Sequence, residues 1–195
     1  MKIAAVTMVT LAATAHSAAG QTGEQKVVVC MEDSATFGIA PLAQMIASGM
    51  FARIGVAIQW HHGLLGCPEL GIQISLSQRT PRTLKPGALG YARPYEGSHI
   101  VLLYDRISEG GRDLIPHLLA HVMVHEITHI LQGTDGHSYT GVMKAHWNYD
   151  DLKNMEWKPL AFTDMDVFLI HRGLAARAAR AEVAMNGTPE AVAAR

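Results

Sequence analysis

The chain has 195 residues, a formal net charge of −1 at pH 7, and a hydrophobic fraction of 49%. This length and composition fit one globular domain with a sizeable core. The balanced charge and the lack of a basic stripe argue against nucleic acid as a partner.

The first twenty residues have the pattern of a cleaved export signal. Lys2 precedes a small and apolar run from Ile3 to Ala15, and small residues at 17–19 suit a cleavage site. The run is short for a membrane span, and no later stretch qualifies. We therefore expect a signal peptide over 1–20, a secreted or periplasmic protein, and no stable membrane association after signal removal. An uncleaved anchor is the alternative.

Strand and helix patterns alternate from residue 26 to residue 105. Pro41 fits the first turn, or a kink, of a helix predicted between 35 and 53 by apolar residues at helical spacing. Prolines at 81 and 86 mark residues 78–87 as a loop. Apolar and β-branched runs predict strands at 26–30, 56–60, 72–76, 88–92 (a short edge strand) and 99–105. This order predicts an α/β fold.

A long buried helix is predicted to end at Gly133. It is apolar on almost all sides, apart from its histidines and Glu126. Pro116 fits only the first turn of such a helix, and Asp113 can cap its start. Gly133 suits the C-terminal stop.

The C-terminal third begins with a stretch, 134–159, that we expect to be irregular. A last helix is predicted to start near Thr163, which forms a capping-box pattern with Asp166. From Ala175 the chain is rich in alanine and arginine, and we expect residues 176–195 to be a mobile tail. The main domain is therefore expected to span residues 21–175.

The predicted buried helix contains the sequence His125-Glu126-Ile127-Thr128-His129. Histidines four residues apart project from nearly the same helix face, so both imidazoles can bind one Zn²⁺ ion. Glu126 lies about 100° round the helix from His125, where it can act as general base on a zinc-bound water without being a ligand.

A catalytic zinc site normally has three protein ligands. We expect His137 to be the third, because nearby glycines permit the sharp reversal that would bring it back over the helix. Asp135 and Glu156 are the alternatives. His117 and His121 continue the four-residue spacing of histidines, but no glutamate follows them, so packing roles are favoured for both.

Other side chains leave two interpretations open. Cys30 and Cys67 could form a disulfide in an exported protein, or remain two buried thiols. The aromatic residues Trp147, Tyr149 and Trp157 could line a specificity pocket, although packing is favoured, and the same holds for His146.

The run from His125 to His137, followed by Met143, resembles the site motif of the metzincin clan of zinc endopeptidases, with matrixins and adamalysins as the closest groups. That motif is HExxHxxGxxH, followed by a methionine in a tight turn. Here Gly133 lies one residue later than in the motif, and His137 two residues later. The pair His137-Ser138 is similar to the third ligand of matrixins and its successor, and the order of predicted elements is similar to that of the clan.

The resemblance implies a twisted mixed sheet, a central zinc-binding helix, a methionine turn with Met143 beneath the metal, and a C-terminal helix. It also implies that a peptide substrate extends along the edge strand at 88–92. We predict a monomeric, exported zinc endopeptidase that acts on a peptide or protein substrate, with Glu126 as general base. The alternative is a metzincin-like zinc-binding protein without catalytic activity, which the longer ligand spacing favours.

Overall fold

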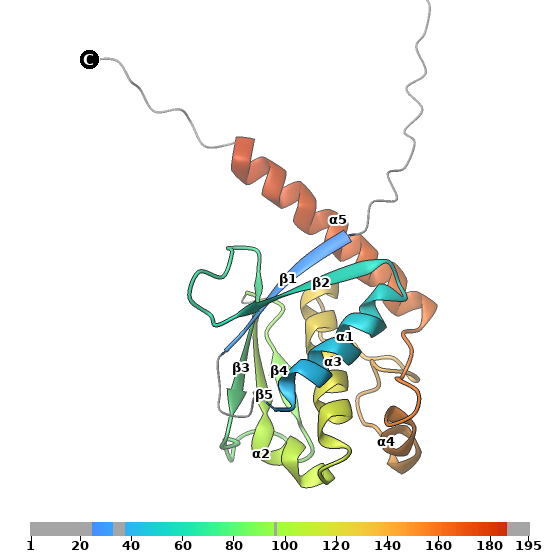
Figure 1. Cartoon of the computed structure of the whole chain (residues 1–195). Coiled ribbons are helices and arrows are strands. Elements are labelled where there is room, and N and C mark those ends of the chain that lie inside the picture. Colours follow the sequence, from blue (N-terminus) through green and yellow to red (C-terminus); the bar gives the residue numbers. More distant parts are fainter. Residues whose placement is uncertain (1–24, 33–37, 96, 187–195) are drawn as a thin grey trace, which may run out of the picture.

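The computed structural model describes residues 25–32, 38–95 and 97–186, and the predicted signal peptide lies outside these residues. Its elements follow in chain order (Figure 1): β1 (Gln25–Met31), α1 (Ala40–Ala52), β2 (Val56–His62), β3 (Ile72–Ser77), β4 (Gly90–Ala92), β5 (His99–Leu103), α2 (Tyr104–Ile107), a 3₁₀ turn (Ser108–Gly110), α3 (Ile115–Gln132), α4 (Tyr149–Met155) and α5 (Asp164–Asn186).

The five strands form one mixed sheet in the order β2-β1-β3-β5-β4. The first four are mutually parallel, and β4 pairs antiparallel with β5 at the edge. Helix α1 connects the parallel neighbours β1 and β2, and it packs beside α3 on the same side of the sheet (Figure 1). The predicted α/β fold with a mixed sheet and a short edge strand is confirmed.

Helix α3 is the centre of the core. Every residue from 118 to 132 is buried, in agreement with its apolar sequence. Pro116 lies in the first turn, and Gly133 ends the helix in the left-handed conformation, with φ 68°. The predicted cap at Asp113 is wrong. Leu114 occupies the cap position without a side-chain hydrogen bond. A turn in which the Gly111 carbonyl accepts from the N–H groups of Leu114 and Ile115 leads directly into the helix.

The C-terminal third contains more helix than the sequence analysis predicts. Helix α4 lies within the stretch expected to be irregular and starts with a capping box formed by Asn148 and Asp151. The predicted capping box of Thr163 and Asp166 is present at the start of α5. Helix α5 then continues to Asn186, so part of the segment expected to be a tail is helical.

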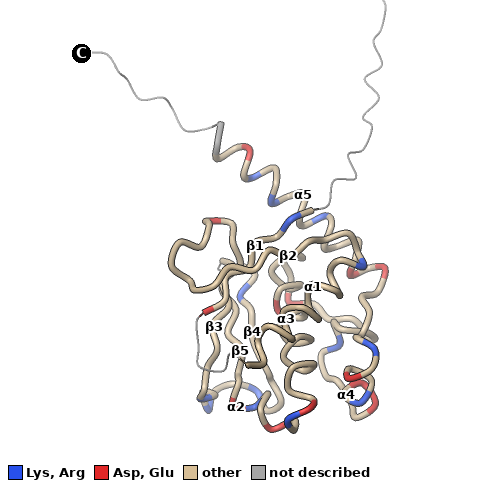
Figure 2. Tube along the Cα trace, in the orientation of Figure 1, with Lys and Arg blue, Asp and Glu red and all other residues tan. Residues whose placement is uncertain are grey.

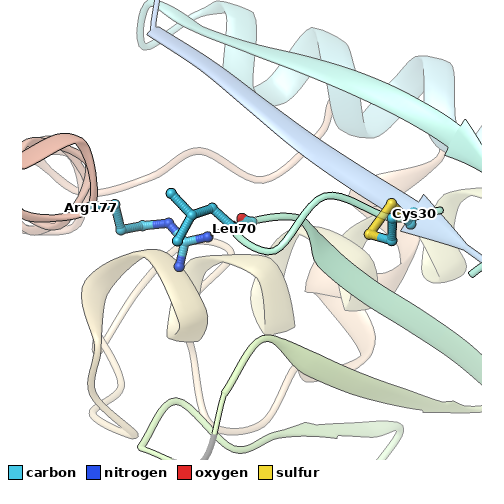
Figure 3. Close-up of a disulfide and its surroundings, with 4 residues drawn as sticks. Cys30, Leu70 and Arg177 are labelled. Carbon is cyan, nitrogen blue, oxygen red and sulfur yellow. Dashed lines mark hydrogen bonds between the residues drawn. A yellow bond between two sulfur atoms is a disulfide. The ribbon is translucent and has the colours of Figure 1, made fainter. Parts of the chain in front are cut away.

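A disulfide bond joins Cys30 in β1 to Cys67 in the connection between β2 and β3 (Figure 3). This settles the choice left open by the sequence. Three residues after Cys67, the carbonyl of Leu70 accepts a hydrogen bond from Arg177, so α5 is fastened to the same connection.

Charged residues lie mainly around α2, on α4 and along α5, whereas α3 carries Glu126 alone (Figure 2). None of the helices in the described parts of the chain is both long and apolar enough to cross a membrane.

Candidate metal centre and active site

Three histidines meet at the C-terminal half of α3. His125 and His129 lie one turn apart on the helix, and the following loop brings His137 back over them. One side-chain nitrogen of each histidine lies within 4.8 Å of the other two. Asp135 and Glu156 do not join this group, and no second group of this kind occurs among the described residues. The structure therefore brings together the three predicted ligands.

Hydrogen bonds fix the orientation of the two helical rings. Nδ1 of His125 lies 2.9 Å from the carbonyl oxygen of Val142, and Nδ1 of His129 lies 2.9 Å from that of Thr134. A carbonyl oxygen can only accept, so each Nδ1 must carry the proton and donate it. In the neutral rings, each Nε2 is therefore left with a free lone pair.

These two Nε2 atoms face each other at 3.0 Å. Two lone pairs at this distance repel unless a proton or a cation lies between them. The ring of His137 completes the cluster, with its centroid 5.2 Å from that of His125 and 5.0 Å from that of His129. Three imidazoles, in two of which the Nδ1–H donates a hydrogen bond to a backbone carbonyl and leaves Nε2 available, form a set of ligands that suits Zn²⁺.

Burial keeps these imidazoles in the neutral form that a metal requires. It lowers the pKa of His125 to about 4, and the neighbouring His129 acts in the same direction. Burial also lowers the pKa of His129 and, although this residue is exposed, desolvation lowers the pKa of His137 too. Near neutral pH, the three rings are therefore ready to bind a cation without first losing a proton.

Glu126 lies between α3 and the edge strand β4, with 6% of its surface exposed. A Cβ atom at Gly90 would lie 3.2 Å from a carboxylate oxygen of Glu126 and 3.1 Å from Val122, so the strand approaches the helix closely. Burial raises the pKa of Glu126 to about 8, against a hydrogen bond from the Ala92 backbone that lowers it. A divalent cation nearby would favour the ionised form.

Met143 lies in a tight turn next to the carbonyl that orients His125. Its side chain is fully buried, and its own carbonyl accepts a hydrogen bond from the Ser138 N–H at 2.8 Å. Gly141 adopts a φ of 77°, and a Cβ there would lie 2.2 Å from the carbonyl oxygen of Ala161. Only glycine fits this position. The role of Met143 beneath a metal stays a prediction.

His121 has a packing role, as predicted. Its Nδ1 donates to the carbonyl of His117 at 2.7 Å, and its Nε2 accepts from the Leu160 N–H at 3.0 Å. Both ring nitrogens are therefore engaged within the protein. Burial lowers the pKa of His121 to about 4.

The predicted packing of the aromatic residues holds for Trp147 only. Its ring packs edge-on against His125 and His121, at centroid distances of 5.7 and 6.2 Å. Tyr149, the first residue of α4, is 77% exposed, and Trp157, just beyond the C-cap of α4, is 84% exposed. His146 is also exposed, and its charge helps to lower the pKa of His137.

Several groups around the site were not expected from the sequence. They include the backbone carbonyls of Thr134 and Val142, and the hydrogen bond from Ser138 to Asp166. Backbone carbonyls leave no signal in a sequence. The pattern Thr163-x-x-Asp166 did indicate a cap, but nothing indicated that the same carboxylate would reach Ser138.

Comparison with known proteins gives structural matches only. No family model matches the sequence, and no curated protein matches it. The crystal structure of archaemetzincin from Methanopyrus kandleri matches with a TM-score of 0.57 and 16% identity, over 80% of this chain and 99% of that chain. A malonate complex of archaemetzincin from Archaeoglobus fulgidus matches with a TM-score of 0.45 and 14% identity, over 74% of this chain and 99% of that chain.

At these identities, the first match bears on the fold alone. The particular likeness to matrixins and adamalysins is not confirmed. The chain has the fold of archaemetzincin, with a five-stranded mixed sheet and a histidine cluster that could hold a metal ion.

Proposed function

We propose that the protein is an exported, zinc-dependent endopeptidase. In this proposal His125, His129 and His137 bind Zn²⁺, and Glu126 is the general base. The main observation in its favour is that the Nε2 atoms of His125 and His129 lie 3.0 Å apart. The imidazole of His137 completes the group, and the next residue after His125 is the buried Glu126. The archaemetzincin-type fold supports a metallopeptidase.

Bound zinc would supply a Lewis acid that polarises the scissile carbonyl and makes water more acidic. Glu126 would take a proton from the attacking water and pass it to the leaving amine. Its burial excludes bulk water from this proton transfer. The carboxylate must be ionised to accept the proton, and the positive charge of the metal opposes the effect of burial on its pKa.

The edge strand β4 offers a place for the backbone of an extended peptide. The Leu89 carbonyl accepts a hydrogen bond from the Leu103 N–H, so the alternation of a strand turns the backbone groups of Gly90 and Ala92 to the outer side. The Ala92 N–H donates to Glu126, so the groups offered to a peptide are those of Gly90 and the Ala92 carbonyl. A peptide or protein substrate could therefore pair with β4 by strand addition, next to Glu126.

Export is supported by the disulfide between Cys30 and Cys67, because such bonds persist in oxidising compartments. The apolar run near the start of the sequence supports it as well. We further propose that the mature protein is a monomer.

The test compares the parent protein with Glu126→Gln, both loaded with zinc, on an unfolded protein substrate. Glutamine keeps the shape of the side chain but cannot accept the proton. We expect unchanged zinc content and a loss of turnover by a factor of about 10²–10⁴. Removal of zinc from the parent with a chelator should abolish cleavage, and zinc should restore it.

The alternative is a non-catalytic zinc-binding protein, which the longer ligand spacing and the exposure of His137 favour. It predicts that both proteins retain zinc and that neither cleaves the substrate. Cleavage by Glu126→Gln at the rate of the parent would contradict the proposed role of Glu126.

A further inference from the structure

The three candidate zinc ligands are not held in the same way. His125 and His129 are buried, and each is fixed through Nδ1 by a backbone carbonyl. His137 is exposed, and among the described residues its ring nitrogens have no hydrogen-bond partner. The position of this third imidazole must therefore come from the backbone on either side of it.

The loop is fastened just before and just after His137. On the N-terminal side, the Thr134 carbonyl accepts from His129, and its Oγ1 accepts from the Gly136 N–H at 3.2 Å. On the C-terminal side, Ser138 donates its N–H to the Met143 carbonyl at 2.8 Å. The hydroxyl of Ser138 also makes a contact outside the loop, with helix α5.

That hydroxyl donates to Oδ1 of Asp166 at 2.6 Å, and Asp166 is 3% exposed. The other carboxylate oxygen, Oδ2, accepts from the N–H and the Oγ1 of Thr163, at 2.8 and 2.7 Å. One oxygen thus caps α5 and the other holds the loop. The two tasks of this carboxylate can be separated by changing one partner at a time.

We propose that Ser138 and Asp166 are positioning residues that set the affinity of the site for zinc through His137. This inference rests on the proposed zinc site. The backbone hydrogen bond from Ser138 to Met143 fixes only one point of the loop that follows Gly133, so the third ligand can still move unless the Ser138 side chain is held as well. A hydrogen bond to a buried carboxylate is charge-assisted and therefore strong enough to do so. Partners that orient metal ligands typically change metal affinity by about 10–100-fold when they are removed.

The experiment uses the full chain and three variants: Ser138→Ala, Ser138→Thr and Thr163→Ala. The zinc dissociation constant is measured by competition with a chromophoric chelator, and thermal unfolding is measured on the metal-free proteins. We expect Ser138→Ala to bind zinc about 10–100-fold more weakly. Ser138→Thr keeps the hydroxyl and should bind zinc nearly as tightly as the parent.

Thr163→Ala is the matched control, because it removes the other hydroxyl that contacts Asp166. It should lower the unfolding temperature by weakening the cap of α5, yet leave the zinc dissociation constant unchanged. Unchanged zinc affinity in Ser138→Ala would overturn the inference and leave the zinc site standing. An equal loss in Ser138→Ala and Thr163→Ala would also overturn it, because the effect would then be general loosening of α5. Absence of zinc binding by the parent would refute the zinc site itself.

Discussion

Gly173 lies where helix α5 crosses the C-terminal end of α3, and its replacement by alanine tests this packing. A Cβ atom at Gly173 would lie 1.7 Å from the carbonyl oxygen of Leu131 and 2.9 Å from its carbon. Real Cβ atoms essentially never approach other atoms within 3.0 Å. The two helices would therefore have to separate by more than 1 Å, and the obstacle is backbone, which cannot turn away as a side chain would.

The expected loss of stability in Gly173→Ala is the difference between two opposing effects. Overpacking in a well-packed core typically costs about 1–3 kcal/mol, and a backbone clash belongs at the upper end. Alanine gains back about 1 kcal/mol relative to glycine through its helix preference. We expect Gly173→Ala to lower the free energy of unfolding by about 2 kcal/mol. For a chain of this size, that is a drop of roughly 4–8 °C in Tm.

Gly49→Ala in α1 is the matched control. Gly49 is exposed, and a Cβ atom there meets nothing within 4 Å. The same substitution should therefore raise the free energy of unfolding by about 0.5–1 kcal/mol. Urea unfolding followed by circular dichroism measures both variants. A Gly173→Ala protein as stable as the parent would show that α5 and α3 do not cross as closely as described.

Three further predictions concern the disulfide, a buried histidine and the edge strand. The double variant Cys30→Ser, Cys67→Ser removes a disulfide between residues 37 positions apart in the sequence. Its free energy of unfolding, measured in urea, should fall by about 4 kcal/mol. A reductant should destabilise the parent to the same extent and leave the variant unchanged. The pKa of His121 is about 4 in the folded protein, below its ordinary value of 6.5. Its contribution to stability is therefore complete above pH 6.5 and is lost as the pH falls towards 4, by about 3 kcal/mol. Urea titrations at several pH values should show a shallower acid loss in His121→Phe than in the parent. Gly90→Ala should push the Glu126 carboxylate by a few tenths of an ångström and lower the turnover of the proposed peptidase about 10-fold. Its zinc affinity should stay that of the parent, and a parallel loss of zinc would contradict this view of the contact.

Local sequence patterns predicted the strands and helices that are determined by residues close together in the sequence. The apolar runs at β1, β2, β3 and β5, the helical spacing of apolar residues in α1 and the almost entirely apolar sequence of α3 were sufficient to predict these elements. The strand expected at 99–105 ends at Leu103, because the chain turns into α2, where Asp105 accepts hydrogen bonds from Thr80.

In the C-terminal third, the sequence contains signals for two helical segments that were not predicted, α4 and the last part of α5. The pattern Asn148-x-x-Asp151 carries the same capping signal as Thr163-x-x-Asp166, but the weak apolar periodicity of α4 hid it. The alanine and arginine residues after Ala175 are good helix formers, so their composition favoured a continued helix over a tail.

His137, the proposed third ligand, shows why the rest of the site could not be predicted. Helical spacing fixes His125 and His129 relative to each other, since four residues always make about one turn. No such rule fixes His137, because the path of the loop depends on Asp166, which is 28 residues beyond Ser138 in the sequence. A motif such as HExxHxxGxxH describes a loop of one fixed length, held by the contacts that suit that length. A longer loop can deliver the same imidazole if it is anchored on both sides of the ligand, as this one is at Thr134 and Ser138. The length of the loop alone therefore does not decide whether His137 reaches His125 and His129. The contacts of the residues on either side of His137 decide it.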